Sequence, residues 1–372
     1  MFKFLKNFLI VIRLYNYLSV HSWFFNLLKE LKLNSNLANG IILTQVVRNY
    51  DFILRIAIIS KVITEKYNLN LRAYNSNISW KTKNNFKGRL LEYPFKFFLK
   101  NVFEKIYSSL VTKNAFDLDS KYKNQTIIKS ELNKVISNID FLDPGSVLKI
   151  KFENILVGDL IYDSYLRFFN KPTLKKINSD LIYVIEKSLN SYYISKDFIN
   201  KNNVKILLTT YVTYIEHGLV TRLCLKKSIP VYTIASKDYV LQKVTNDFPC
   251  HVKDHSNYDP NKKLSNSQLV IAKSKLESRL KGFNDEAISY MKNSPFKNVK
   301  MDPVLKNNFN INKRNIVIYM HDFFDSPHVY RTLQFLDLYM FLKEILDEME
   351  GIKSTSVFVK IHPNFTENVK ET

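Results

Sequence analysis

A cluster of histidine, aspartate and arginine residues directly follows an apolar segment at residues 315–320. His321, Asp325, His328 and Arg331 follow this segment in the sequence. If the segment is a strand of a parallel sheet, these side chains lie beyond its carboxyl end, where such sheets bind ligands. The same composition suits a capped helix start, which also attracts anions. Both interpretations are compatible with a polar, anionic ligand at this position.

A Lys-x-His-Pro string closes the next apolar segment, residues 356–361. Lys360 and His362 can both pair with phosphate oxygens, and Pro363 restricts the loop backbone. We expect the two strand ends to face one pocket, because the second strand follows one crossover after the first. No partner ligand stands at metal spacing, so the sequence predicts no metal site here.

Four further residues are candidates for a general base or for a group that holds an acceptor. Glu216 and His217 stand where a helix is expected to begin, and Asp159 and Asp163 lie farther upstream. A carboxylate or an imidazole can remove the proton from an attacking hydroxyl. For Glu216 and His217 the alternative is a capped helix, with Gly218 present for close packing.

The composition is that of a folded protein with two domains. The chain has 372 residues, of which 46% are hydrophobic and 24% charged, which is enough apolar material for two cores. Only 7 residues are Gly, and neither a GxGxxG nor a GxxxxGK[ST] string occurs, which argues against Gly-rich phosphate loops. Cys224 and Cys250 match no zinc or redox spacing. We therefore expect neither a metal nor a cofactor.

The net charge of +21 raises the question of nucleic-acid binding. Only 10 of the 55 basic residues are Arg, and the basic residues are scattered along the chain. Base recognition favours the Arg fork over Lys, so we expect no nucleic-acid partner. An anionic membrane surface and nucleotide-bearing substrates fit the charge at least as well.

Residues 1–35 are rich in aromatic and cationic side chains. Lys6, Arg13 and Lys29 interrupt the apolar stretch, which is therefore too short for a bilayer span of about 20 apolar residues. No small-residue cleavage site follows, which argues against a signal peptide. We expect an amphipathic helix that either lies on the inner membrane surface or packs on its own domain. The protein is accordingly predicted to be cytoplasmic, with peripheral membrane association as one outcome.

Hydrophobic periodicity predicts alternating strands and helices, and hence an α/β fold. A strand at 204–209, a helix at 216–227 and a strand at 229–234 have the spacing of a parallel βαβ unit. The pattern lapses at 298–313, the predicted linker, and then restarts. The other expected elements are strands at 41–47, 147–157, 315–320 and 356–361, helices at 52–67, 113–140, 180–195, 268–293 and 332–350, and a loop at 68–87.

Several strings resemble bacterial capsule and surface polysaccharide glycosyltransferases. IVIYMHDFFDSPHVYRTLQFLDLYMFLKEIL and VFVKIHPN resemble the opening of the donor domain of these enzymes. IKFENILVGDLIYDSYLRFFNKPT and YIEHGLVTRLCLKKSIPVY look like segments of their acceptor domain. The similarity covers residues 147–364. The Lys-x-His-Pro string is shared more widely, with sialyl-, Kdo- and glycerophosphate-transferring relatives.

The resemblance implies a GT-B-like fold with two Rossmann-like domains. Residues 36–300 would form the acceptor-side domain, and residues 314–372 would form the start of the donor domain. The Gly/Ser-rich and acidic segment that completes the nucleotide pocket in such folds has no counterpart after residue 364. We therefore expect the second Rossmann-like domain to be incomplete at its C-terminal side.

The implied activity is transfer of a sugar from a nucleotide-activated donor, with CMP-linked donors among the candidates, to a glycan or lipid-linked acceptor. His362 and Pro363 match the element expected to contact the nucleotide phosphate. Two alternatives stay open: transfer of a polyol phosphate from a CDP-linked donor, and a non-catalytic fragment that binds glycan or membrane. The expected donor-binding residues are His321, Asp325, His328, Arg331, Lys360, His362 and Pro363, and the candidate bases are Asp159, Asp163, Glu216 and His217.

Overall fold

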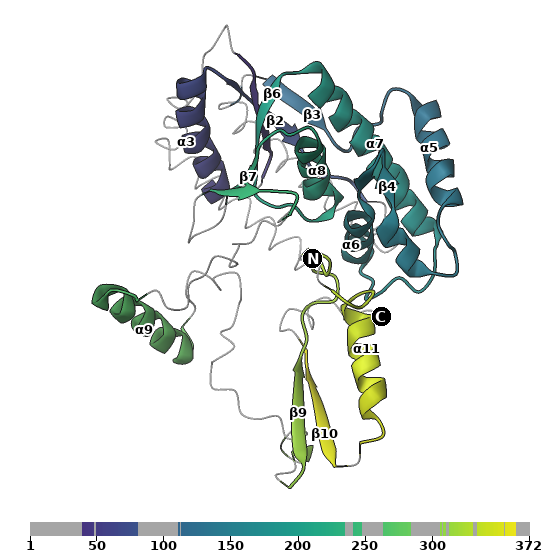
Figure 1. Cartoon of the computed structure of the whole chain (residues 1–372), viewed down its shortest axis with the longest axis vertical. Helices are drawn as coiled ribbons and strands as arrows, with labels where there is room; N and C mark the ends of the chain where they lie inside the picture. Colours follow the sequence, from purple (N-terminus) through teal and green to yellow (C-terminus); the bar gives the residue numbers. More distant parts are fainter. Residues whose placement is uncertain are drawn as a thin grey trace, which may run out of the picture. The chain divides into compact units, whose positions relative to one another are not determined.

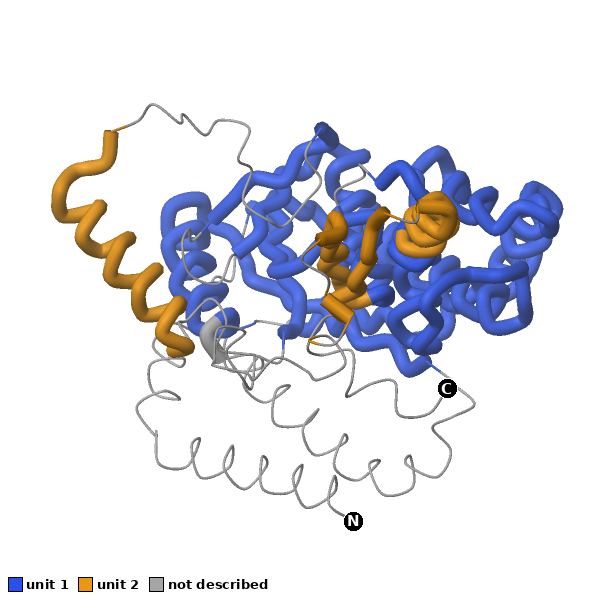
Figure 2. The backbone as a smooth tube through the Cα atoms, turned by 90° about the horizontal axis from the view of Figure 1, so that it is seen from below, with its two compact units in different colours: residues 1–252, 323–341 blue, residues 253–322, 342–372 orange. Residues whose placement is uncertain are grey.

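A computed structural model describes the chain as two compact units. The first comprises Met1–Val252 and Phe323–Phe341, and the second comprises Lys253–Asp322 and Leu342–Thr372 (Figure 2). The predicted helix at 1–35 lies outside the described residues, and so does most of the predicted linker at 298–313. The described residues are 39–47, 50–80, 111, 113–234, 241–247, 263–283, 306, 308–309, 312–329, 333–352 and 354–361.

A six-stranded sheet forms the centre of the first unit. Its strand order is β3-β2-β1-β6-β7-β8, and every neighbouring pair is parallel except β7 with β8 (Figure 1). This mostly parallel sheet, with helices packed on it, confirms the predicted α/β class. The strands are β1 (Ile41–Gln45), β2 (Asn70–Asn75), β3 (Lys113–Asp117), β6 (Val204–Thr209), β7 (Val231–Thr233) and β8 (Gln242–Val244).

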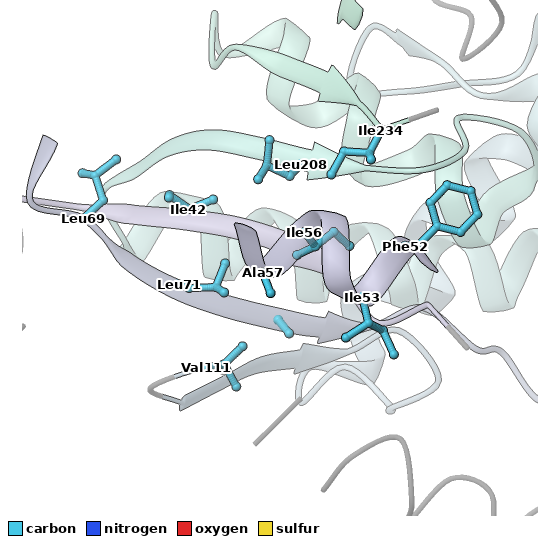
Figure 3. Close-up of a cluster of buried hydrophobic side chains, with 11 residues drawn as sticks. Ile42, Phe52, Ile53, Ile56, Ala57, Leu69, Leu71, Val111, Leu208 and Ile234 are labelled. Carbon is cyan, nitrogen blue, oxygen red and sulfur yellow. The ribbon is translucent and has the colours of Figure 1, made fainter. Parts of the chain in front are cut away.

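The hydrophobic core on one face of the sheet lies under helix α3 (Tyr50–Tyr67). Ile42 and Leu208, on neighbouring strands, share a buried cluster with Ile53 and Ile56 of α3 (Figure 3). All five residues of β1 are buried, as expected for a strand that is covered on both faces. The helices on the other face are α7 (Ser179–Lys201) and α8 (Leu219–Lys226), with α5 (Gln125–Ser137) packed on α7 (Figure 1).

Helix α6 (Gly158–Phe169) is the element on which the candidate site is built. It packs against α7 and against a π-helix, η3 (Tyr214–Gly218). Asn170 ends α6 in the left-handed conformation, with φ 56°, which is a common way to end a helix. Asn178 then caps α7 by accepting a hydrogen bond from a backbone N–H of its first turn.

The second unit contains two parallel strands, β9 (Arg314–Tyr319) and β10 (Thr355–Lys360), joined through α11 (Leu338–Met349). This arrangement confirms the predicted restart of the strand-helix-strand pattern. The apolar run at 315–320 leads one to expect a buried strand, and that expectation is wrong, since Val317 is 45% and Tyr319 is 74% exposed. Among the described strands β9 pairs only with β10, so few side chains cover it. The other described helix of this unit is α9 (Asn266–Leu280).

Two stretches predicted as loop and helix contain strands. The loop predicted at 68–87 contains β2, and the helix predicted at 113–140 begins as β3 before it continues as α5. Both strands are short and carry polar residues, so hydrophobic periodicity does not reveal them. The helix predicted at 268–293 is described only as far as α9 and the turn after it, and the helix predicted at 332–350 begins later, at Leu338.

The single strand predicted at 147–157 was also wrong. The chain forms a 3-10 helix, η2 (Pro144–Lys149), and then a short antiparallel hairpin. Between the hairpin strands, Glu153 and Asn154 have positive φ angles of 45° and 69°, and two such residues reverse the chain tightly. The hairpin strands are β4 (Lys151–Phe152) and β5 (Ile155–Leu156).

Candidate functional site

Helix α6 carries polar side chains into the interior of the first unit. Asp159, Asp163 and Ser164 are all buried, although the other buried residues of this helix are mostly apolar. A buried charge is costly unless it is paired. Each of these three groups is indeed bonded to a residue from a distant part of the chain, and these bonds define the candidate site.

Asp163 pairs with His328, from the segment that follows β9. His328 Nδ1 lies 2.6 Å from Asp163 Oδ1, and the His328 backbone N–H donates to Asp163 Oδ2 at 3.3 Å. On the other side of the ring, His328 Nε2 donates to the Leu336 carbonyl at 2.9 Å. The sequence predicted Asp163 as a base and His328 as a donor-binding residue. The structure joins them in one buried pair.

The surroundings of His328 stabilise its protonated form. Burial alone would lower the pKa of this imidazole, but the hydrogen bond and charge of Asp163, helped by the Leu336 carbonyl, raise the pKa above its ordinary value. An imidazolium donates from both ring nitrogens, which matches the two acceptors. His328 therefore serves as the cation that neutralises Asp163 in the interior.

Asp337 caps α11 and ties the start of that helix to α6. Its Oδ1 accepts from the Met340 N–H at 2.9 Å, and its Oδ2 accepts from the Tyr162 hydroxyl at 2.6 Å. Burial, and then the nearby charge of Asp337, raise the pKa of Tyr162 strongly, so the phenol stays a donor. Neither residue was predicted from the sequence. An acidic residue directly before an amphipathic helix is a capping signal that could have identified Asp337.

Asp159 is bound by Arg222 of α8 in a bidentate ion pair. Arg222 Nη1 donates to Oδ1 at 2.6 Å and Nη2 donates to Oδ2 at 2.5 Å. Nη1 also donates to the Leu156 carbonyl at 2.6 Å. The two charged side chains are only 10% and 12% exposed. A role for Asp159 as general base would require this pair to open. Arg222 was not predicted from the sequence, although an Arg in a Lys-rich chain is itself a signal for bidentate pairing.

The π-helix η3 packs on α6 and carries an unusual backbone conformation. The Ile215 N–H donates to Ser164 Oγ at 2.9 Å. Tyr214, which begins η3, has a φ of 55°, and a bulky residue in this region stores strain of a kind that clusters at functional sites. The Tyr214 hydroxyl donates to Asp325 Oδ1 at 3.0 Å. Asp325, predicted to bind the donor, thus lies beside η3.

His217 lies at the carboxyl end of β1, beside the sheet. Gln45 Nε2 contacts His217 Nδ1, and Gln45 Oε1 accepts from Thr209 Oγ1 at 3.0 Å. The Gln45 amide nitrogen is therefore the donor and His217 Nδ1 the acceptor, which assigns the ring proton to Nε2. This position agrees with the rule that parallel sheets present ligand-binding groups at the carboxyl ends of their strands.

Glu216 is oriented by two donors from the chain that follows β2. Its Oε1 accepts from the Ile78 N–H at 3.0 Å and from the Trp80 indole N–H at 3.2 Å. Trp80 in turn stacks on Phe168 of α6, with ring centroids 4.9 Å apart. Glu216 therefore connects the end of β2 to the region between η3 and α6. The predicted bases Asp159, Asp163, Glu216 and His217 all lie in this part of the first unit.

In the second unit, the ends of β9 and β10 lie side by side. Tyr319 and Lys360 are paired in register, and the Met320 N–H donates to the Lys360 carbonyl at 2.9 Å. The Lys360 ammonium lies over the Tyr319 ring, 5.4 Å from its centroid. His321 follows directly, so two predicted donor-binding residues stand at adjacent strand ends. The predicted residues Arg331, His362 and Pro363 lie outside the described residues.

Within the described residues, no group of three or more His, Cys, Asp or Glu side chains is placed to hold a metal ion.

Comparison with known proteins assigns no relative to this chain. No family model matches it, no curated protein is significantly similar, and no solved structure matches.

Proposed function

We propose that this chain transfers a sugar from a nucleotide-activated donor to a growing capsule or surface polysaccharide. The observation that carries the proposal is the pair of parallel strands in the second unit, with His321 and Lys360 at their adjacent ends. Ligands bind beyond such strand ends, and Lys and His both suit phosphate oxygens. The resemblance of the sequence to surface polysaccharide glycosyltransferases, with a GT-B-like fold, supports the same proposal.

On the acceptor side we assign the leading roles to Glu216 and His217. Asp159 and Asp163 are committed to buried ion pairs, whereas Glu216 and His217 stand beside the carboxyl ends of the sheet strands. Glu216 takes the proton from the attacking hydroxyl, and His217 donates a hydrogen bond from Nε2 to an acceptor oxygen. The hydroxyl oxygen bonds to the anomeric carbon as the nucleotide phosphate leaves with the bonding electron pair.

The purified protein should bind CMP and UDP ligands, and His362→Ala should weaken that binding about ten- to a hundredfold. The change removes a charge-assisted hydrogen bond to a phosphate oxygen, which is worth about 1.5–3 kcal/mol in a desolvated site. Lys360→Ala should also weaken binding of the same ligands, because Lys360 is the last residue of β10 and stands two positions before His362. Calorimetric titration of each variant measures the effect.

Lys343→Ala is the matched control, because it removes the same charge from an exposed ion pair with Asp347 on α11. Its nucleotide affinity should equal that of the wild type. Failure of the wild type to bind either nucleotide would contradict the proposal. An unchanged affinity in His362→Ala would make His362 a structural turn residue. Preferential use of a CDP-linked polyol would assign the chain to polyol phosphate transfer instead.

We also predict that residues 1–35 hold the protein on anionic membranes. Among the described residues, no helix has both the length and the apolar content required to cross a bilayer. Lys and Arg near an anionic surface each contribute about 1 kcal/mol, and removal of this segment should therefore lower binding about tenfold or more. Co-sedimentation with anionic and neutral vesicles tests the idea, and equal sedimentation of both forms with anionic vesicles would refute it.

A further inference from the structure

The segment 323–341 belongs to the first unit, while the chain on both sides of it belongs to the second. His328 holds the segment on α6 through Asp163, and Asp337 holds it through Tyr162. These two bonds therefore anchor on α6 a stretch of the first unit that continues into the second unit at both of its ends. A change that weakens the bonds of His328 or Asp337 should therefore loosen the attachment of this segment to α6.

The contacts of His328 require a proton that a free histidine lacks at neutral pH. The Leu336 carbonyl can only accept, so Nε2 must carry a proton. On the opposite side, Nδ1 and an Asp163 carboxylate oxygen are 2.6 Å apart, and a proton must lie between them to prevent the contact of two lone pairs. The pair therefore holds one proton more than a neutral imidazole and a carboxylate would.

Two arginines of the described residues bind other carboxylates, so they do not replace this proton. Arg222 binds Asp159, and Arg167 lies 4.0 Å from Asp325. The Tyr162 ring meets the imidazole edge-on, with centroids 5.2 Å apart. Among the described residues, Asp159, Tyr162 and Asp163 of α6 are the charged or titratable groups that act on the His328 ring. The next groups outward contact these neighbours or the same segment: Arg222 of α8 pairs with Asp159, Asp337 accepts from Tyr162, and Arg167 of α6 and Tyr214 of η3 contact Asp325.

We propose that protonated His328 is a pH-dependent latch that holds residues 323–329 and 333–337 on α6. Loss of the proton turns the contact between Nδ1 and Asp163 into a repulsion between lone pairs, and the segment then detaches more often. The latch is a conformational control built into the first unit. It does not depend on the glycosyltransferase activity proposed above.

The direction of the pH effect follows from the two states of the histidine. The pKa of a free histidine is about 6.5, and in the folded protein the bonds to Asp163 and Leu336 outweigh burial and raise the pKa of His328. Such a group contributes stability that is complete below about pH 6.5 and is lost as the pH rises through the folded value. The latch is therefore closed under mildly acidic conditions and opens on the alkaline side.

Hydrogen exchange of the backbone amides in 323–337, measured from pH 6 to pH 10 and corrected for intrinsic exchange, tests the latch. Amides of β1 and β6 in the centre of the sheet serve as the internal reference. Wild-type protection in the segment should fall about ten- to a hundredfold relative to this reference, which is the expected loss of a charge-assisted hydrogen bond. His328→Gln retains a donor without a titratable ring, and its protection should be low at every pH.

Asp163→Asn should move the wild-type transition to lower pH, because the imidazole loses the carboxylate that favours its charge. Asp325→Asn is the control, since it alters an exposed contact of the same segment and should leave the transition in place. ¹⁵N NMR of the wild type needs no variant: one of the seven histidine rings should remain doubly protonated after the pH has risen far enough to neutralise the other rings. Segment protection that parallels the reference throughout, or seven rings that lose their charge over the same pH range, would overturn the proposal.

Discussion

Replacing Arg222 by Met should lower the free energy of unfolding by about 3–5 kcal/mol at neutral pH. The change keeps much of the side-chain volume but leaves the Asp159 carboxylate buried without its partner, and an uncompensated buried charge has a cost of this size. It also removes the donor to the Leu156 carbonyl. Denaturant unfolding followed by circular dichroism measures the loss.

Two companion variants separate the unpaired charge from lost packing. The double change Asp159→Leu with Arg222→Met should recover most of the stability, because an apolar pair replaces a buried ion pair at little cost. Lys343→Met breaks the ion pair with Asp347, whose side chains are 53% and 58% exposed, and should change stability by no more than about 0.5 kcal/mol. Equal losses in Arg222→Met and Lys343→Met would contradict the interpretation.

The main parallel strands could be predicted because they are apolar runs in the sequence. β1, β6 and β9 are bounded by polar residues and were found within two residues of their observed limits. The strands that were missed, β2 and β3, read Asn-Leu-Arg-Ala-Tyr-Asn and Lys-Asn-Ala-Phe-Asp. Their strand conformation is set by pairing with β1 and with each other. Pairing partners lie outside any local window, so the propensity of the segment alone does not reveal them.

The candidate site was predicted as separate residues, and its pairing was not. Asp163 and His328 were both singled out from composition and position, yet they stand 165 positions apart and were given different roles. Tyr162 and Asp337 are 175 positions apart, and neither was identified. Such bonds depend on which part of the first unit the segment after β9 packs against. Hydrophobic periodicity within the segment carries no information on this packing. What the sequence does reveal is polar character at the ends of strands, and that character was correctly located for His321 and Lys360.

Gly158→Ala should lower the free energy of unfolding by about 1–3 kcal/mol, the usual cost of overpacking, although Ala favours a helix over Gly by about 1 kcal/mol. A Cβ atom at this position would lie 2.2 Å from the Val147 carbonyl oxygen and 2.5 Å from the Leu148 carbonyl. These are backbone atoms of η2, so no change of rotamer relieves the clash. The start of α6 must therefore shift, and the steric term exceeds the gain in propensity.

Gly351→Ala is the matched control for this prediction. Nothing lies within 4 Å of a Cβ atom at Gly351, so the same substitution there should change stability by no more than about 0.5 kcal/mol. Thermal and denaturant unfolding of both variants, measured side by side, give the comparison. Because α6 also carries Asp159 and Asp163, its displacement in Gly158→Ala should loosen their bonds to Arg222 and His328. Protection of 323–337 against hydrogen exchange should therefore fall in Gly158→Ala and stay at the wild-type level in Gly351→Ala. Equal stability and equal protection in the two variants would show that the close approach of α6 to η2 has no structural importance.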